Sequence, residues 1–186
     1  MEESLNVLTA DLEAQELKIA TSNGTPTADL YSKLLALYLY RDELCSAKFL
    51  WQRIPEQVKS ENPELASIWA VGKCIWLRDY KGIYQALKKT WSEHVSDIMK
   101  KVEEMIRTRA INLITQAYSC VSLETVAEMT GLSDEQVIAT CMEKGWDVDN
   151  TTRMVTPKKP KVELTSGTTS EDQLFKLTEF VSFLEN

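Results

Sequence analysis

One stretch of the sequence decides the fold: residues 121–138 read VSLETVAEMTGLSDEQVI. Ser122 can cap the start of a first helix, and Gly131 suits the left-handed position at which such a helix ends. Ser133 and Gln136 have the Ser-x-x-Gln spacing of a capping box, which predicts a second helix directly after a tight turn. The stretch therefore predicts helix, turn and helix, with the second helix ending at Gly145.

The residues that follow predict a β-hairpin. Apolar and polar side chains alternate over residues 146–148 and 152–155, and Asp149-Asn150 supplies the turn between them. A helix-turn-helix followed by a hairpin is a winged helix, which we place at residues 119–157. We expect strand 152–155 to lie at an edge of the small sheet, where Met154 and Val155 would bind a partner, because unpaired strand edges recruit further strands.

The preceding residues, 1–118, predict a helical-hairpin stack of the tetratricopeptide or HEAT type, so the expected fold class is mainly α. Apolar spacing predicts one antiparallel helix pair around a turn at residues 38–42, a second pair after Pro63, and one long helix over residues 92–118. Arg41 and Arg78 occupy similar junctions about 37 residues apart, close to the period of such repeats. We expect the tryptophans of this region to pack in its core rather than line a peptide-binding groove. They are Trp51, Trp69, Trp76 and Trp91.

The last residues predict a linker and a separate helix. Residues 158–170 are the linker, and residues 171–186 contain a helix with large apolar side chains around most of its circumference. These expected partner-binding residues are Leu174, Phe175, Leu177, Phe180, Val181, Phe183 and Leu184. We expect the helix to dock on a partner, and the alternative is that it folds back onto the chain's own helical stack.

The charge of the chain argues against nucleic acid as a partner. It has 186 residues with 21 basic and 28 acidic side chains, a formal net charge of −7, whereas affinity for nucleic acid comes mostly from Lys and Arg. The second helix of the winged helix would begin with Asp134-Glu135, where a DNA reader needs positive charge. A nucleic-acid-binding winged helix remains the alternative function, with Lys158, Lys159 and Lys161 as its phosphate contacts.

The sequence predicts no catalytic, cofactor or metal site. A zinc isopeptidase needs two or more histidine ligands, and the chain has only His94. The six glycines form no phosphate-binding loop, and the four scattered cysteines indicate reduced, buried thiols rather than disulfides. Without an apolar run long enough for a membrane span or a signal peptide, we expect a protein of the cytoplasm and nucleus that binds neither membrane nor small molecule.

A stack, a long connecting helix, a winged helix and a C-terminal helix, in this order, resemble the PCI module of the proteasome lid, the COP-nine signalosome and an initiation-factor complex. Within that group the chain is similar to the family of the smallest signalosome subunits. The similar segments are residues 34–39 (LLALYL), 51–55 (WQRIP), 82–84 (GIY), 116–118 (QAY), 145–146 (GW), 151–155 (TTRMV) and 183–186 (FLEN).

This resemblance implies a non-catalytic structural subunit. In that family the complex removes a ubiquitin-like modifier from cullins, and so regulates cullin-RING ubiquitin ligases, through a different, metal-dependent subunit. The implied partners are other PCI subunits, contacted through the winged helix and the C-terminal helix. A PCI subunit of the proteasome lid or of the initiation complex remains the alternative.

Overall fold

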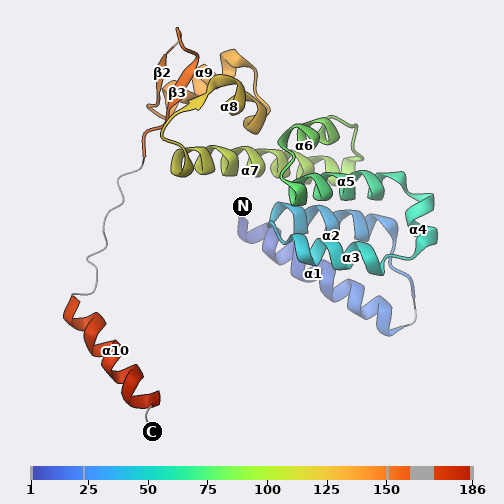
Figure 1. Cartoon of the computed structure of the whole chain (residues 1–186). Coiled ribbons are helices and arrows are strands. Elements are labelled where there is room, and N and C mark those ends of the chain that lie inside the picture. The colour runs from blue at the N-terminus through green and yellow to red at the C-terminus, as the bar shows by residue number, and fades with distance from the viewer. Residues whose placement is uncertain (1, 23, 150, 160–169, 185–186) are drawn as a thin grey trace.

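The computed structural model describes residues 2–22, 24–149, 151–159 and 170–184. Helices dominate it, with one small sheet, so the predicted mainly α fold class is confirmed (Figure 1). The helices are α1 (Glu2–Thr21), α2 (Ala28–Tyr40), α3 (Leu44–Arg53), α4 (Glu56–Glu61), α5 (Pro63–Leu77), α6 (Tyr80–Leu87), α7 (Glu93–Ala117), α8 (Leu123–Thr130), α9 (Asp134–Glu143) and α10 (Ser170–Leu184). The strands are β1 (Val121–Ser122), β2 (Asp147–Asp149) and β3 (Met154–Thr156).

Helix α2 is the centre of the helical stack. It reads ADLYSKLLALYLY and is apolar on nearly every side, as a helix must be when neighbours surround it. It packs against α1, α3, α5 and α7, and the side chains of Leu34, Leu35, Leu37 and Leu39 have no exposed surface. The stack is therefore built around one buried helix rather than around two equal pairs.

Helix α1 covers one flank of α2 by a narrow apolar stripe and two polar contacts. Leu5 and Leu12 are buried. The Tyr38 hydroxyl donates a hydrogen bond to Glu13 at 2.8 Å, and the Arg53 guanidinium donates two to the carboxylate of Glu16, each at 2.7 Å. These contacts fix α1 to both α2 and α3.

Helix α7 belongs to two hydrophobic cores. Its Val102 and Ile106 lie in the core of the stack, whereas Ala110 and Ile114 lie in the core of the winged helix. The apolar residues follow one stripe along the helix without interruption. One continuous helix therefore connects the two parts of the molecule, as Figure 1 shows.

The winged helix begins and ends its helices as the sequence predicts. The Ser122 side chain accepts a hydrogen bond from the Thr125 amide, Gly131 is left-handed with φ 66°, and Ser133 and Gln136 form the predicted capping box. Helix α9 ends at Glu143, just before Gly145, whose φ is 68°. The local capping signals of this stretch are confirmed.

The prediction that strand 152–155 lies at an edge of the sheet is wrong. The sheet has three strands in the order β1-β3-β2, so β3 is the central strand and pairs with a neighbour on both sides. Val155 is fully buried, facing Val121 and Val148, and Met154 is half-buried on the opposite face. The exposed edges belong to β1 and β2, because the two-residue β1, which the sequence pattern did not predict, occupies the expected open side of β3.

Two expectations about burial also need correction. Trp51 and Trp69 stack with ring centroids 5.8 Å apart and, like Trp91, are half-buried, but Trp76 is 53% exposed. The four thiols carry no disulfide, yet only Cys141 is buried.

The predicted linker falls mostly on residues 160–169, which lie outside the described residues.

Candidate interaction surfaces

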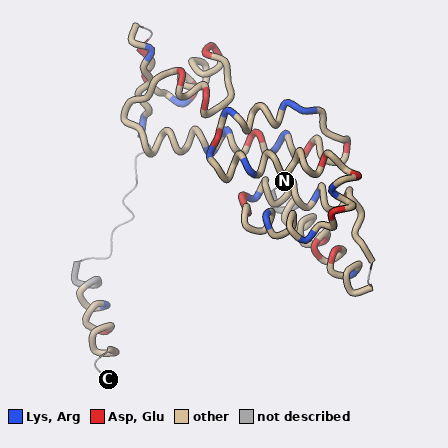
Figure 2. The backbone as a smooth tube through the Cα atoms, turned by 45° about the vertical axis from the view of Figure 1, so that its right-hand side comes forward, with Lys and Arg blue, Asp and Glu red and all other residues tan. Residues whose placement is uncertain are grey.

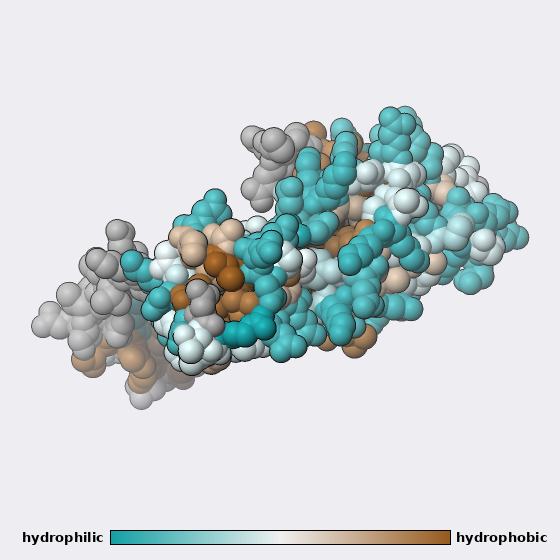
Figure 3. Space-filling view, turned by 90° about the horizontal axis from the view of Figure 1, so that it is seen from above, coloured by the Kyte–Doolittle hydropathy of each residue, from teal (hydrophilic) through white to brown (hydrophobic). Residues whose placement is uncertain are grey.

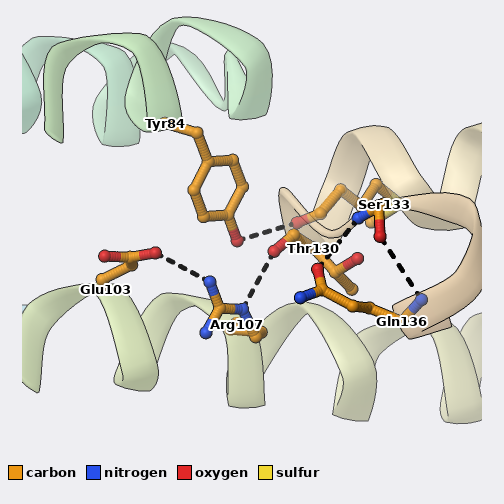
Figure 4. A network of polar contacts seen from close by, with 7 residues as sticks. Tyr84, Glu103, Arg107, Thr130, Ser133 and Gln136 are labelled. Atoms are coloured by element: carbon orange, nitrogen blue, oxygen red, sulfur yellow. Dashed lines mark hydrogen bonds and ion pairs between the residues drawn. The ribbon is translucent and has the colours of Figure 1, made fainter. Parts of the chain in front are cut away.

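The position of the winged helix on the stack is set by a polar joint at the end of α8. The Tyr84 hydroxyl, from α6, donates to the Met129 carbonyl at 3.2 Å, and Arg107 Nε, from α7, donates to the Thr130 carbonyl at 3.1 Å (Figure 4). The last carbonyls of a helix have no partner within the helix and attract positive charge. Two elements of the stack thus cap a helix of the winged helix.

The joint is held from both sides. Arg107 also donates a hydrogen bond to Glu103, one helical turn earlier on α7, at 2.7 Å. This bond orients the guanidinium group toward the end of α8. Burial raises the pKa of Tyr84 to about 12, although Arg107 lowers it, and the hydroxyl therefore stays a neutral donor at physiological pH. The joint was not predicted, because its hydrogen bonds span 45 and 23 residues of sequence.

The outward face of the sheet is the first candidate contact surface. Side chains alternate between faces along a strand, so Met154 points away from the core that Val155 fills. Its cross-strand neighbours are Ser122 of β1 and Asp149 of β2. Seen from above in Figure 3, hydrophobic residues also gather over the winged helix, and Met142 of α9 is 70% exposed.

The charges of the winged helix do not form a nucleic-acid-binding stripe. Figure 2 shows Lys and Arg interspersed with Asp and Glu along this part of the chain. Asp134, at the start of α9, is paired with Arg153 of the β2–β3 turn. The first turn of α9, the helix that would enter the groove of DNA, is thus acidic, and Arg153 beside it is already paired, which disfavours phosphate contacts there.

Helix α10 is the second candidate contact surface. Figure 1 shows it apart from the stack and the winged helix. All seven apolar residues expected to bind a partner are exposed, from 49% for Val181 to 78% for Phe183. A helix with this much exposed apolar surface is typical of an interaction site.

The residues considered for chemistry do not come together. His94 is exposed in the first turn of α7. Within the described ranges, no group of three His, Cys, Asp or Glu side chains is placed to hold a metal ion. Among the helices that the structure describes, none is both long and apolar enough to cross a membrane.

The chain is similar to a family of known proteins over most of its length. The model of the CSN8/PSMD8/EIF3K family matches residues 26–164. The COP9 signalosome complex subunit 8 of Danio rerio is 42% identical over 180 residues, which cover 96% of this chain and 93% of the relative. The subunit 8 of Xenopus tropicalis is 41% identical over 175 residues, covering 94% and 91%. That of Arabidopsis thaliana is 32% identical over 157 residues, covering 84% and 79%.

These matches confirm the resemblance inferred from the sequence. The family match includes α2 to α9 and all three strands, and the matches to the animal relatives extend over nearly the whole chain. On the family match and on these identities, the chain belongs to the CSN8/PSMD8/EIF3K family.

Proposed function

We propose that this protein is a structural, non-catalytic subunit of the COP9 signalosome, which by the resemblance described above removes a ubiquitin-like modifier from cullins. The observation that carries the proposal is the 42% identity over nearly the full length to a COP9 signalosome complex subunit 8. The family description also includes other complexes. Signalosome membership is favoured because relatives from animals and from a plant are all subunit 8 of the signalosome.

The proposed contacts to other PCI subunits are the outward face of the sheet, which includes Met154, and the apolar residues of α10. Exposure of seven large apolar side chains on one helix supports the role of α10. Val155 supports the contact indirectly, because it is buried and holds the central strand in place. As a part of such an assembly, the protein would occur in the cytoplasm and nucleus, which cell fractionation can test.

Affinity purification of the tagged chain from cells tests the assignment. We expect the remaining signalosome subunits in equal amounts. Recovery of proteasome-lid or initiation-factor subunits in their place would contradict the assignment. A double variant, Phe180→Asp with Phe183→Asp, should lose these partners, whereas Val7→Asp, at an exposed apolar position of α1, should retain them.

The non-catalytic role has its own test. His94 is the only histidine, so His94→Ala removes the one imidazole that this subunit could contribute to a reaction. Complexes assembled with the His94→Ala variant should remove the modifier from cullins at the wild-type rate. A large loss of rate in intact complexes would contradict the proposal.

A further inference from the structure

A groove of about 430 Å³ lies where the α2–α3 turn and the α5–α6 turn meet α7. We call it the turn groove. Its floor includes the buried Ile83 and Ile106. Its exposed rim includes Trp76, Leu113, Arg78 and Arg109. Trp76 is 53% and Leu113 44% exposed, so apolar surface continues from the floor to the outside of the molecule. Such a combination of apolar floor and polar rim is typical of binding sites.

The rim of the turn groove is positive although the chain as a whole is negative. Arg109 is paired with Asp42, but Arg78 has no ion pair within the described part of the chain. The Lys48 ammonium lies 5.5 Å from the centroid of the Trp76 ring, a cation–π distance. An acidic, apolar segment would therefore complement the groove in both respects.

Helix α10 is such a segment. It carries three acidic residues against one lysine, and its Leu177, Phe180 and Leu184 are 64%, 70% and 77% exposed. A 15-residue helix is marginally stable in water unless it packs against something. Before any partner is present, α10 therefore needs a surface of the chain itself.

The connection between β3 and α10 is long enough to reach the turn groove. The Thr156 hydroxyl oxygen lies 4.0 Å from the Cys120 sulfur, so the chain leaves the sheet beside the end of α7. Leu113 lies about one turn before the last residue of that helix. The eleven peptide links from Lys159 to Ser170 span up to about 36–40 Å when extended. That reach equals the full length of α7, about 37 Å at 1.5 Å per residue.

We propose that, in the chain outside a complex, α10 closes onto the turn groove, with its apolar side chains on the floor and its carboxylates toward Arg78. Partner subunits then compete with the groove for α10. The inference goes beyond the proposed function and does not rest on it, because it concerns the isolated chain.

Hydrogen exchange of the free, full-length chain tests the closure, with the α10 amides as the readout. Arg78→Glu and Leu113→Gln change the groove at exposed positions that leave the core intact. We expect α10 to exchange at least about tenfold faster in each variant than in the wild type, because an undocked helix of this length opens readily. Met142→Asp, at an exposed apolar position of α9 outside the groove, is the control and should leave α10 exchange unchanged.

Three results would overturn the proposal. One is wild-type α10 that already exchanges as fast as an unstructured peptide, which would mean that it is undocked. Another is slow exchange that neither groove variant changes, which would place α10 on a different surface. The last is protection found only at concentrations where light scattering detects a dimer, which would make the occupant the α10 of a second copy. All three readings are obtained without partner subunits, so they are independent of the purification experiment.

Discussion

Gly131 is where backbone conformation and packing both require glycine. Its φ is 66°, and an added Cβ would lie 2.6 Å from the Tyr84 ring. We expect Gly131→Ala to lower the free energy of unfolding by about 2–4 kcal/mol, from left-handed strain together with overpacking. Urea denaturation measures this change.

Gly145 provides the matched control for that substitution. It has a similar φ of 68° but nothing within 4 Å of an added Cβ, so Gly145→Ala should cost only about 1–2 kcal/mol from the backbone. Equal losses in the two variants would show that the Tyr84 ring moves aside and that the joint is loose.

The Tyr84 hydroxyl makes the free energy of unfolding depend on pH in the alkaline range. Its pKa is raised by burial from 10.0 to about 12 in the folded chain, so the folded state holds a proton that the unfolded state releases between those values. The stabilisation is complete below pH 10 and is lost as the pH rises toward 12. In denaturation curves from pH 9 to 12, Tyr84→Phe should show a smaller decline than the wild type.

Sequence reasoning at the scale of residues succeeded where the interaction is local. Ser122, Gly131 and the Ser133–Gln136 capping box were predicted because each signal lies within four residues of its partner. Tyr84 and Arg107 were missed, because nothing near them in the sequence indicates that they meet the end of α8. Their contacts follow only from the tertiary placement of α6 and α7.

Among the elements, α1 depends on its polar contacts because its apolar stripe is narrow. Arg53→Gln removes the paired hydrogen bonds to Glu16 and should lower the free energy of unfolding by about 1 kcal/mol, with faster hydrogen exchange confined to α1. Arg41→Gln removes the exposed ion pair to Glu43 and should leave α1 exchange unchanged. If both variants behave alike, the Arg53 contact does not hold α1.

Because β3 is the central strand, substitutions at its adjacent residues Met154 and Val155 should differ in their cost to stability. Val155→Asp places a charge in the core and should cost more than about 3 kcal/mol, whereas Met154→Asp, on the outward face, should cost about 1 kcal/mol or less. Thermal unfolding gives the stabilities, and co-purification gives partner binding. If Met154→Asp leaves both stability and partner binding unchanged, the outward face is not a contact surface.

The strand order could not be predicted from the pattern that revealed the hairpin. Alternation needs several residues to be visible, and β1 has only two, directly before a helix that uses Ser122 as its N-cap. The antiparallel pair β2–β3 was predicted from its turn, but the strand that covers the other side of β3 was not.

For the whole molecule, removal of α10 separates folding from assembly. A chain that ends at Pro160 keeps both hydrophobic cores, since neither includes a residue of α10 among those whose burial the structure describes. We expect it to unfold in the same cooperative transition while failing to enter the complex stably. Calorimetry and co-purification measure the two properties, and loss of the cooperative transition would contradict the expectation.

The general architecture followed from the sequence because long amphipathic periods and caps determine it. The turn groove did not, because it forms where the turns at Asp42 and Arg78 meet Leu113 of α7, three places far apart in the chain. Exposure of Trp76 was missed for the same reason, since helical spacing alone does not say which face another helix covers.

The sharing of α7 between the two cores has a mechanical consequence. Ile106 and Ala110 are one turn apart, yet they belong to different cores, so there is no unsupported turn at which the helix could bend. A force or torque that a neighbouring molecule applies to the winged helix is therefore transmitted along α7, over about 37 Å, to the stack. The angle between the winged helix and the stack therefore stays fixed, and any assembly that incorporates the protein is built with that angle.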